Sequence, residues 1–220
     1  MDRNQSWGTE DELFGAAERT AIEGFYASYE PAQVKFEYRS LADQVGTVRN
    51  VFYGDSITQA WPLHEFFPGV SILNRGIGGD NAVGLHLRLE TDVLRYRPER
   101  VFMMVGINGI GWPEDLTVAR ITYVAHELLE RGVRVWLGSI CPLRFPDKWD
   151  RFQYQDRIVR VNARLAEWAS AHGCGFLDYH AALRDGDGQL RTEFARPDGT
   201  HLLLPAYVVM SRLVAPHLAR

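Results

Sequence analysis

A serine, an aspartate and a histidine in this chain have the types and spacing that covalent acyl transfer requires. Ser56 lies within residues 54–58 (GDSIT), and His201 follows Asp198 by three residues within residues 198–201 (DGTH). A serine hydroxyl is a weak nucleophile that needs an adjacent base, and imidazole suits that task because it titrates near neutral pH. A nearby carboxylate can fix the imidazole tautomer and stabilise the imidazolium. We therefore predict that Ser56 is the nucleophile, His201 the base and Asp198 its orienting partner.

Two other stretches contain hydrogen-bond donors that a tetrahedral intermediate would need. Residues 76–80 are GIGGD, and Asn108 lies within residues 106–109 (GING). Donors that stabilise an oxyanion are typically backbone N–H groups or side-chain amides held in place before the reaction. We predict an oxyanion hole made of the backbone N–H groups of Ser56 and Gly79 and the side-chain amide of Asn108.

The elements that would position these four stretches follow from hydrophobic patterning. From residue 49 onward, short apolar runs rich in Val, Ile and Phe alternate with helical patterns. Such runs are typical of strands buried on both faces, and their alternation with helices indicates a parallel sheet covered on both sides. The predicted strands are 51–53, 70–73, 101–105, 133–140 and 175–177, and the predicted helices are 83–95, 114–131, 151–172 and 205–219. Because sites in such sheets form beyond the carboxyl ends of the strands, we expect the four stretches to converge.

The first 47 residues have a different pattern. Residues 9–30 predict one helix, whose apolar stripe includes Leu13, Ile22 and Phe25. Residues 32–47 predict a short strand or turn. We therefore divide the chain into an N-terminal helical extension over residues 1–47, packed on the core, and a catalytic domain over residues 48–220.

Simpler interpretations exist for some of these residues. Serine often caps a helix, and an Asp-Gly pair such as residues 198–199 often marks a turn. Among the other histidines, His180 follows the predicted strand 175–177 and is the only serious rival to His201 as the base. The four stretches together favour the catalytic interpretation over these local ones.

Spacing excludes several rival sites. The glycine stretch is not G-x-G-x-x-G, because residue 81 is Asn and the stretch follows the second predicted strand rather than the first. The chain lacks a P-loop, the zinc motif H-E-x-x-H and the G-x-S-x-G elbow of α/β hydrolases. Cys141 and Cys174 lack metal-site spacing and are expected to be buried, reduced thiols.

Composition narrows the function classes further. The formal net charge of −4 argues against a nucleic-acid-binding protein, which normally has a basic face. No segment approaches 18 apolar residues, so we predict no membrane span. The N-terminal residues contain no apolar stretch of signal-peptide length, and we predict a cytoplasmic location.

The four stretches resemble those of the SGNH or GDSL hydrolases, most closely the branch that contains the catalytic subunits of intracellular platelet-activating-factor acetylhydrolase. The resemblance covers about residues 48–218, and the spacing from Asp198 to His201 is its most specific feature. It implies a flavodoxin-like three-layer α/β/α sandwich with a five-stranded parallel sheet, and the roles already given to the triad and the oxyanion donors. It implies no metal and no organic cofactor. One departure is Gly109, which stands where the family usually has Asp and bears on how Asn108 is held.

The loops after the third and fourth predicted strands are expected to line the substrate site. Trp112 and Leu143 would provide an apolar and aromatic rim, which suits short acyl groups, aryl esters or a sugar face. Arg144 or Lys148 would meet an anionic group, and Asp55 is a further predicted substrate contact. The alternative is that these residues only pack the loops. Because no lipase-like apolar lid is present, we favour small, soluble esters such as acetyl esters on a carbohydrate.

We therefore predict a serine esterase that acts on a small-molecule ester. A second hypothesis is a non-catalytic small-molecule or carbohydrate-binding protein on the same scaffold. A third is a nucleotide- or flavin-binding α/β protein. The oligomeric state stays open and includes a homo-oligomer.

Overall fold

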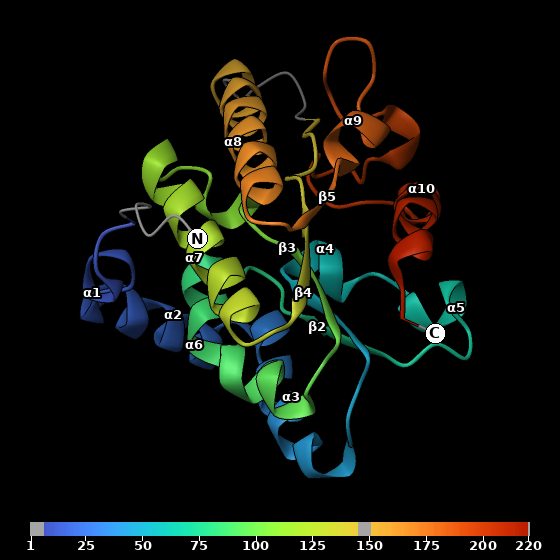
Figure 1. Cartoon of the computed structure of the whole chain (residues 1–220). Helices are drawn as coiled ribbons and strands as arrows, with labels where there is room; N and C mark the ends of the chain where they lie inside the picture. The colour runs from blue at the N-terminus through green and yellow to red at the C-terminus, as the bar shows by residue number, and fades with distance from the viewer. Residues whose placement is uncertain (1–6, 145–150, 220) are drawn as a thin grey trace.

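The computed structural model describes residues 7–144 and 151–219 of the 220-residue chain. Its strands are β1 (Asn50–Gly54), β2 (Ile72–Gly76), β3 (Arg100–Met104), β4 (Arg134–Gly138) and β5 (Gly175–Leu177). They form one parallel sheet in the order β2-β1-β3-β4-β5 (Figure 1). This is the flavodoxin-like strand order, so the predicted five-stranded parallel sheet is confirmed.

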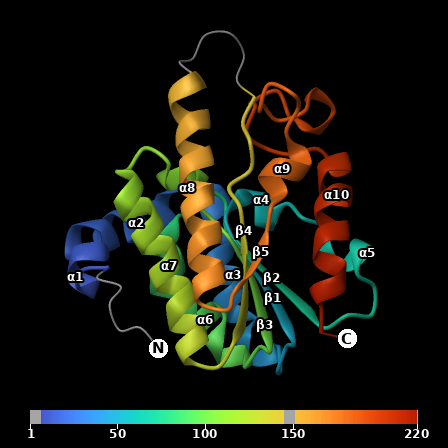
Figure 2. The same ribbon diagram turned by 45° about the horizontal axis from the view of Figure 1, so that its top comes forward.

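Helices cover both faces of the sheet, which gives three layers (Figure 2). On one face lie α6 (Ala82–Asp92), α7 (Glu114–Glu130) and α8 (Arg151–Ala171). On the other face lie α4 (Ser56–Gln59), α5 (Leu63–Phe66), α9 (Tyr179–Leu183) and α10 (Leu204–Val214). The four helices predicted after residue 49 correspond to α6, α7, α8 and α10. In the part of the chain that the structure describes, no helix has the length and apolar character to cross a membrane.

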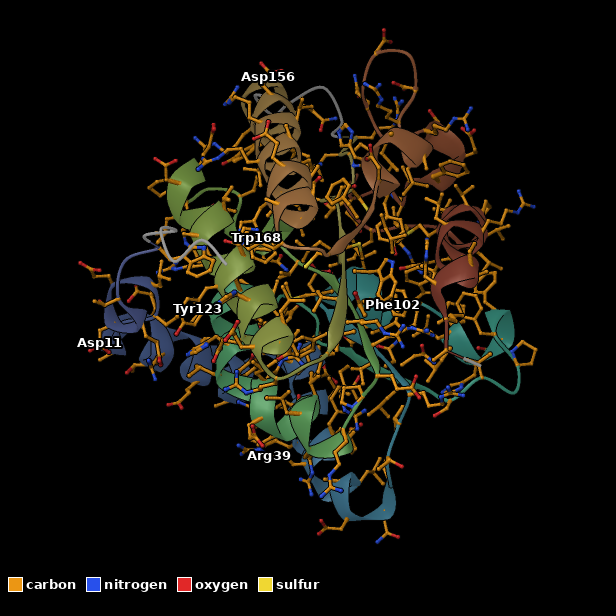
Figure 3. All side chains as sticks on the ribbon, viewed as in Figure 1. Asp11, Arg39, Phe102, Tyr123, Asp156 and Trp168 are labelled. Atoms are coloured by element: carbon orange, nitrogen blue, oxygen red, sulfur yellow. The ribbon has the colours of Figure 1, made fainter. Side chains whose placement is uncertain are left out.

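Alternating side chains of the central strands enter two separate apolar cores. Val51 and Tyr53 of β1 belong to the core under α6, α7 and α8, whereas Phe52 belongs to the core under α10. Phe102 of β3 stacks on Phe52 with 4.8 Å between the ring centroids. Figure 3 shows Phe102 on the α10 side of the sheet and Tyr123 on the α7 side. Burial of both faces explains why the strand sequences are continuous apolar runs.

The N-terminal extension is helical, as predicted, but residues 9–30 do not form one helix. The chain forms α1 (Glu10–Leu13) and α2 (Ala16–Ser28) instead. Between them, the backbone of Phe14 leaves the helical region at φ −133° and ψ 49°. Successive side chains on one helix diverge by about 100°, so the break allows the adjacent Leu13 and Phe14 side chains both to be buried.

Residues 32–47 contain a helix, α3 (Val34–Ser40), rather than the predicted short strand or turn. The helical period is hard to see in this segment because few of its apolar residues are buried, and Phe36 is 49% exposed. The helices α1 and α2 lie beside α7 and α6 (Figure 1). Ile22 and Tyr26 of α2 belong to the same core as the strand residues.

Candidate active site

Two glycines allow α4 to approach the strand ends closely. Gly54 and Gly76 are paired in the parallel register of β1 and β2. A Cβ on Gly54 would lie 2.2 Å from the carbonyl oxygen of Met104, and a Cβ on Gly76 would lie 2.1 Å from the backbone nitrogen of Gln59. Neither position has room for a side chain. Ser56 is the first residue of α4, so it lies just beyond the carboxyl end of β1.

Three side chains from two distant parts of the chain form a line of polar contacts. Nε2 of His201 lies 3.0 Å from Oγ of Ser56, and Nδ1 of His201 lies 3.0 Å from Oδ2 of Asp198. The side chains of His201 and Asp198 are 43% and 50% exposed. The imidazole is therefore within proton-transfer distance of the hydroxyl, at a point that solvent can reach.

The turn that carries Asp198 and His201 is held by its own carboxylate and by a neighbouring loop. Oδ1 of Asp198 accepts hydrogen bonds from the backbone N–H groups of Thr200 and His201, each at 2.8 Å. Gly199 has a φ of +72°, which favours glycine, and its carbonyl accepts from the backbone N–H of Arg144 at 2.7 Å. Partial burial acts in the opposite direction, but these hydrogen bonds and the contact with His201 lower the pKa of Asp198 below its ordinary value.

The predicted oxyanion donors follow β1, β2 and β3, whose carboxyl ends lie at the same edge of the sheet. Among the described residues, neither the backbone N–H of Ser56 nor that of Gly79 has a hydrogen-bond acceptor in the protein. Nδ2 of Asn108 donates to the carbonyl oxygen of Asp80 at 2.8 Å. An amide nitrogen carries two protons, so Asn108 keeps one for another acceptor.

The departure at Gly109 has a steric reason. A Cβ on Gly109 would lie 2.7 Å from the ring of Trp112. The ring of Trp112 is itself covered by the guanidinium of Arg120, 4.4 Å from the ring centroid. The bond from Asn108 to the backbone of Asp80 therefore positions the amide without a carboxylate at residue 109.

A buried ion network that the sequence did not predict lies beneath the glycine stretch. Arg88 is fully buried and donates from Nε to Asp80 at 2.7 Å and from Nη1 to Asp92 at 3.0 Å. It also donates to the carbonyl oxygens of Gly54 at 3.0 Å and Arg75 at 2.9 Å, in β1 and β2. The four-residue spacing of Arg88 and Asp92 was the only sequence signal, and on a helix it usually indicates an exposed pair.

Asp55 has a different role from the predicted substrate contact. Its side chain is 2% exposed, and it accepts a hydrogen bond from the backbone N–H of Ile57 at 3.0 Å as the N-cap of α4. Burial raises the pKa of Asp55 to about 7. The structure does not support Asp55 as a substrate contact, because its carboxyl group does not reach solvent.

Two other predicted substrate contacts also pack within the protein. Leu143 is buried in the core under α8. The Arg144 side chain donates to the carboxylate of Asp185 and to the carbonyl of Leu190. The Leu143 side chain is therefore closed to a substrate, whereas the side chains of Arg144, 29% exposed, and Trp112 stay half-buried. Lys148 lies outside the described residues.

Among the described residues, the rival histidine and the two cysteines form no hydrogen bond with Ser56, Asp198 or His201. His180 belongs to α9 and is 7% exposed, and burial lowers its pKa. Its Nε2 has no hydrogen-bond partner among the described residues, so the structure does not pair it with Ser56. Cys141 is a buried free thiol and Cys174 a half-buried one. Over residues 7–144 and 151–219, no group of three or more His, Cys, Asp or Glu side chains is arranged to hold a metal ion.

Known proteins are similar to this chain in sequence and in fold. The model of the GDSL-like Lipase/Acylhydrolase family matches residues 52–207. The chain is 30% identical over 174 residues to the platelet-activating factor acetylhydrolase IB subunit alpha1 of Bos taurus, which covers 74% of this chain and 68% of that protein. It is 30% identical over 83 residues to an acetylxylan esterase of Geobacillus stearothermophilus, which covers 37% of this chain. That match spans only 38% of the esterase's own length.

A solved structure extends the similarity to the N-terminal part. A GDSL-like lipase from Bacteroides thetaiotaomicron superposes with a TM-score of 0.70 at 26% sequence identity. The superposition covers 92% of this chain and 97% of that one. The similarity in fold therefore extends beyond residues 52–207.

Proposed function

Because the chain belongs to the GDSL-like lipase/acylhydrolase family, we propose that it is a serine esterase that hydrolyses small carboxylic esters through an acyl-enzyme. The single observation that carries this proposal is the 3.0 Å contact between Nε2 of His201 and Oγ of Ser56, with Asp198 on the opposite ring nitrogen. An imidazole held between a hydroxyl and a carboxylate is the arrangement that activates a serine nucleophile.

The geometry supports a two-step reaction. In the first step, Oγ of Ser56 forms a bond to the ester carbon while Nε2 of His201 takes the hydroxyl proton. The bond from carbon to the alcohol oxygen then breaks, and His201 returns the proton to the departing alcohol. In the second step, His201 takes a proton from a water that attacks the acyl carbon. The bond from this carbon to Oγ of Ser56 then breaks, His201 returns the proton to Oγ, and the acid is released.

The oxyanion of each tetrahedral intermediate would accept hydrogen bonds from three donors. These are the unpaired backbone N–H groups of Ser56 and Gly79 and the second proton of the Asn108 amide. Because the donors are held by the protein before the reaction, they stabilise the developing charge without reorganisation.

The acyl group that we propose is acetyl or another short chain. Two relatives support this choice by their names, which describe one as an acetylhydrolase and the other as an acetylxylan esterase. Trp112 and Arg144 are the predicted rim residues that stay half-buried rather than fully buried. A panel of acetylated sugars and simple acetyl esters would identify the alcohol part.

The test of the function is hydrolysis of p-nitrophenyl acetate by the purified protein. We expect Ser56→Ala and His201→Ala to lower kcat/KM by at least about 10³-fold with the fold intact, because the members of such a triad act as a unit. Ser28→Ala, an exposed serine on α2, serves as the matched control and should leave the rate unchanged. Hydrolysis that persists in Ser56→Ala would exclude the mechanism. Binding of an ester without turnover or fluorophosphonate labelling would support a non-catalytic binding protein instead.

Three expectations from the sequence stay predictions. They are the division of the chain between residues 47 and 48, the cytoplasmic location and the oligomeric state, which includes a homo-oligomer as one possibility. Size-exclusion chromatography with light scattering addresses the third, and the stability of a shortened chain addresses the first.

A further inference from the structure

Phe25 of the N-terminal extension touches one of the proposed oxyanion donors. Gly79 has a φ of +76°, and a Cβ built on it would lie 2.4 Å from Cζ of Phe25 and 3.1 Å from Cε2. The edge of the aromatic ring therefore occupies the space directly beside the Gly79 backbone. Phe25 precedes the matched residues 52–207, so the family pattern does not account for it.

The ring of Phe25 is held firmly in this place. Tyr29, the C-cap residue just after α2, stacks on it with 5.0 Å between the ring centroids and an interplanar angle of 27°. The next residue, Tyr26, donates a hydrogen bond from its hydroxyl to the carboxylate of Asp80 at 2.8 Å. This bond attaches α2 to the end of the glycine stretch. Phe25 is half-buried and Tyr29 is 44% exposed, so the two stacked rings lie at the surface of the protein.

The strand order indicates which part of an ester would lie beside these two rings. Ser56 follows β1, and Gly79 follows β2, which is the neighbour of β1 at the edge of the sheet. His201 is on the opposite side, because its turn is bonded to Arg144 in the loop after β4. The leaving alcohol must lie near His201 to receive its proton. The oxyanion faces the N–H groups of Ser56 and Gly79, and the acyl chain is the remaining substituent of the tetrahedral carbon. It therefore extends away from His201, toward the edge of the sheet where Phe25 lies against Gly79.

We propose that Phe25 closes the acyl side of the site and limits the hydrolysed acyl group to a few carbon atoms. This inference rests on the proposed esterase function and names the residue that sets its chain-length specificity. Tyr29 supports the ring from behind and makes the limit rigid.

The experiment compares p-nitrophenyl acetate, butyrate and octanoate, which share one leaving group. Rejection of a single methylene by a pocket is worth about 10-fold or more. We expect Phe25→Ala to raise the ratio of kcat/KM for butyrate over acetate by about 10-fold or more, and Phe25→Trp to lower it. Phe36→Ala is the matched control, because Phe36 is an exposed aromatic residue of α3 in the same extension, and its ratio should stay at the wild-type value.

The outcomes separate this inference from the proposed function. Wild-type protein without Ser56-dependent hydrolysis would contradict the function itself. Ser56-dependent hydrolysis with an unchanged butyrate-to-acetate ratio in Phe25→Ala and Phe25→Trp would overturn the inference alone. If Phe25→Ala does not fold, Phe25→Leu replaces it, and the same ratio decides. If Phe25→Ala changes only the relative kcat/KM values of acetates with different alcohols, Phe25 lies on the leaving-group side, and this result would also overturn the inference.

Discussion

At the scale of single residues, Asp198 uses its two carboxylate oxygens for different tasks. Oδ1 accepts the backbone N–H groups of Thr200 and His201 and so shapes the turn, whereas Oδ2 contacts the imidazole of His201. The same side chain therefore positions the backbone of His201 and orients its ring. A substitution that keeps the hydrogen bonds to the turn but removes the negative charge beside the imidazole can separate these two tasks.

We predict that Asp198→Asn keeps the turn but lowers kcat by about 10²- to 10⁴-fold, because an amide can cap the turn and cannot stabilise the imidazolium. Steady-state kinetics with p-nitrophenyl acetate measure the loss, and thermal unfolding checks that the fold persists. Asp187→Asn, an exposed aspartate in a nearby turn, is the control. A kcat for Asp198→Asn within about threefold of wild type would contradict the orienting role.

Asp55 is a second single residue with a distinct effect, because it makes the stability of the protein depend on pH. Burial raises its pKa from an ordinary value of 3.8 to about 7, so the folded protein binds this proton more tightly than the unfolded chain. The stability that this group contributes is fully present below about pH 4 and is lost as the pH rises through 7. The contribution of Asp55 to the free energy of unfolding is at most about 4 kcal/mol, because each unit of pKa difference between the folded and unfolded states is worth about 1.4 kcal/mol.

We predict that Asp55→Asn becomes more stable relative to wild type as the pH rises from 4 to 8. The amide oxygen can still accept the Ile57 N–H, but the residue no longer titrates. Urea unfolding across this pH range measures the difference in the free energy of unfolding. A difference that stays constant with pH would show that Asp55 does not titrate in this range.

At the scale of elements, α2 is attached to the glycine stretch by one buried hydrogen bond. The hydroxyl of Tyr26 donates to Asp80, whose second oxygen accepts from Arg88. Arg88 in turn holds the carbonyl oxygens of Gly54 and Arg75. The extension, the glycine stretch and the ends of β1 and β2 are thus parts of one polar network, and its strength depends on every partner being present.

We predict that Tyr26→Phe lowers the free energy of unfolding by about 1.5–3 kcal/mol, the usual cost of losing a hydrogen bond to a charged group. Tyr38→Phe is the matched control, because its hydroxyl donates to the neutral carbonyl of Gly76 at 3.0 Å and should cost about 0.5–1.5 kcal/mol. Urea unfolding measures both. Equal losses in the two variants would indicate that the carboxylate of Asp80 adds nothing to the bond with α2.

At the scale of the whole molecule, the N-terminal extension completes one of the two cores. Leu13, Phe14, Ile22 and Tyr26 are buried in the same cluster as the residues of β1, β3 and β4. The fully buried Arg120 of α7 also bonds to the backbone and side chains of the extension. Without these residues, the outer faces of α6 and α7 would be exposed to water.

We predict that a chain without residues 1–47 does not unfold cooperatively and binds a hydrophobic dye such as ANS, because it loses part of one core. Calorimetry and dye fluorescence measure these properties. The full-length chain with Leu41→Ser, an exposed apolar residue of the extension, is the control. Cooperative unfolding of the shortened chain within about 5 °C of wild type would show that residues 48–220 fold as an independent unit.

Local sequence patterns were sufficient to predict most of the sheet and the polar stretches that accompany Ser56. Strands buried on both faces leave continuous apolar runs, and parallel strands bring their carboxyl ends to one edge. The stretches around Ser56, Gly79 and Asn108 therefore had to converge once the strands were recognised. The break at Phe14 and the helix α3 were missed, because both depend on which side chains the rest of the molecule buries.

The sequence by itself determined the residue types that can transfer an acyl group and the order of strands and helices that gathers them, because both are encoded in short segments. Only the tertiary structure decided that Asp55 is a buried cap, that Arg88 is an interior cation and that Phe25 lies against Gly79. Each of these depends on contacts between residues far apart in the chain. No local pattern records such contacts, since burial and steric exclusion arise only when the layers pack together.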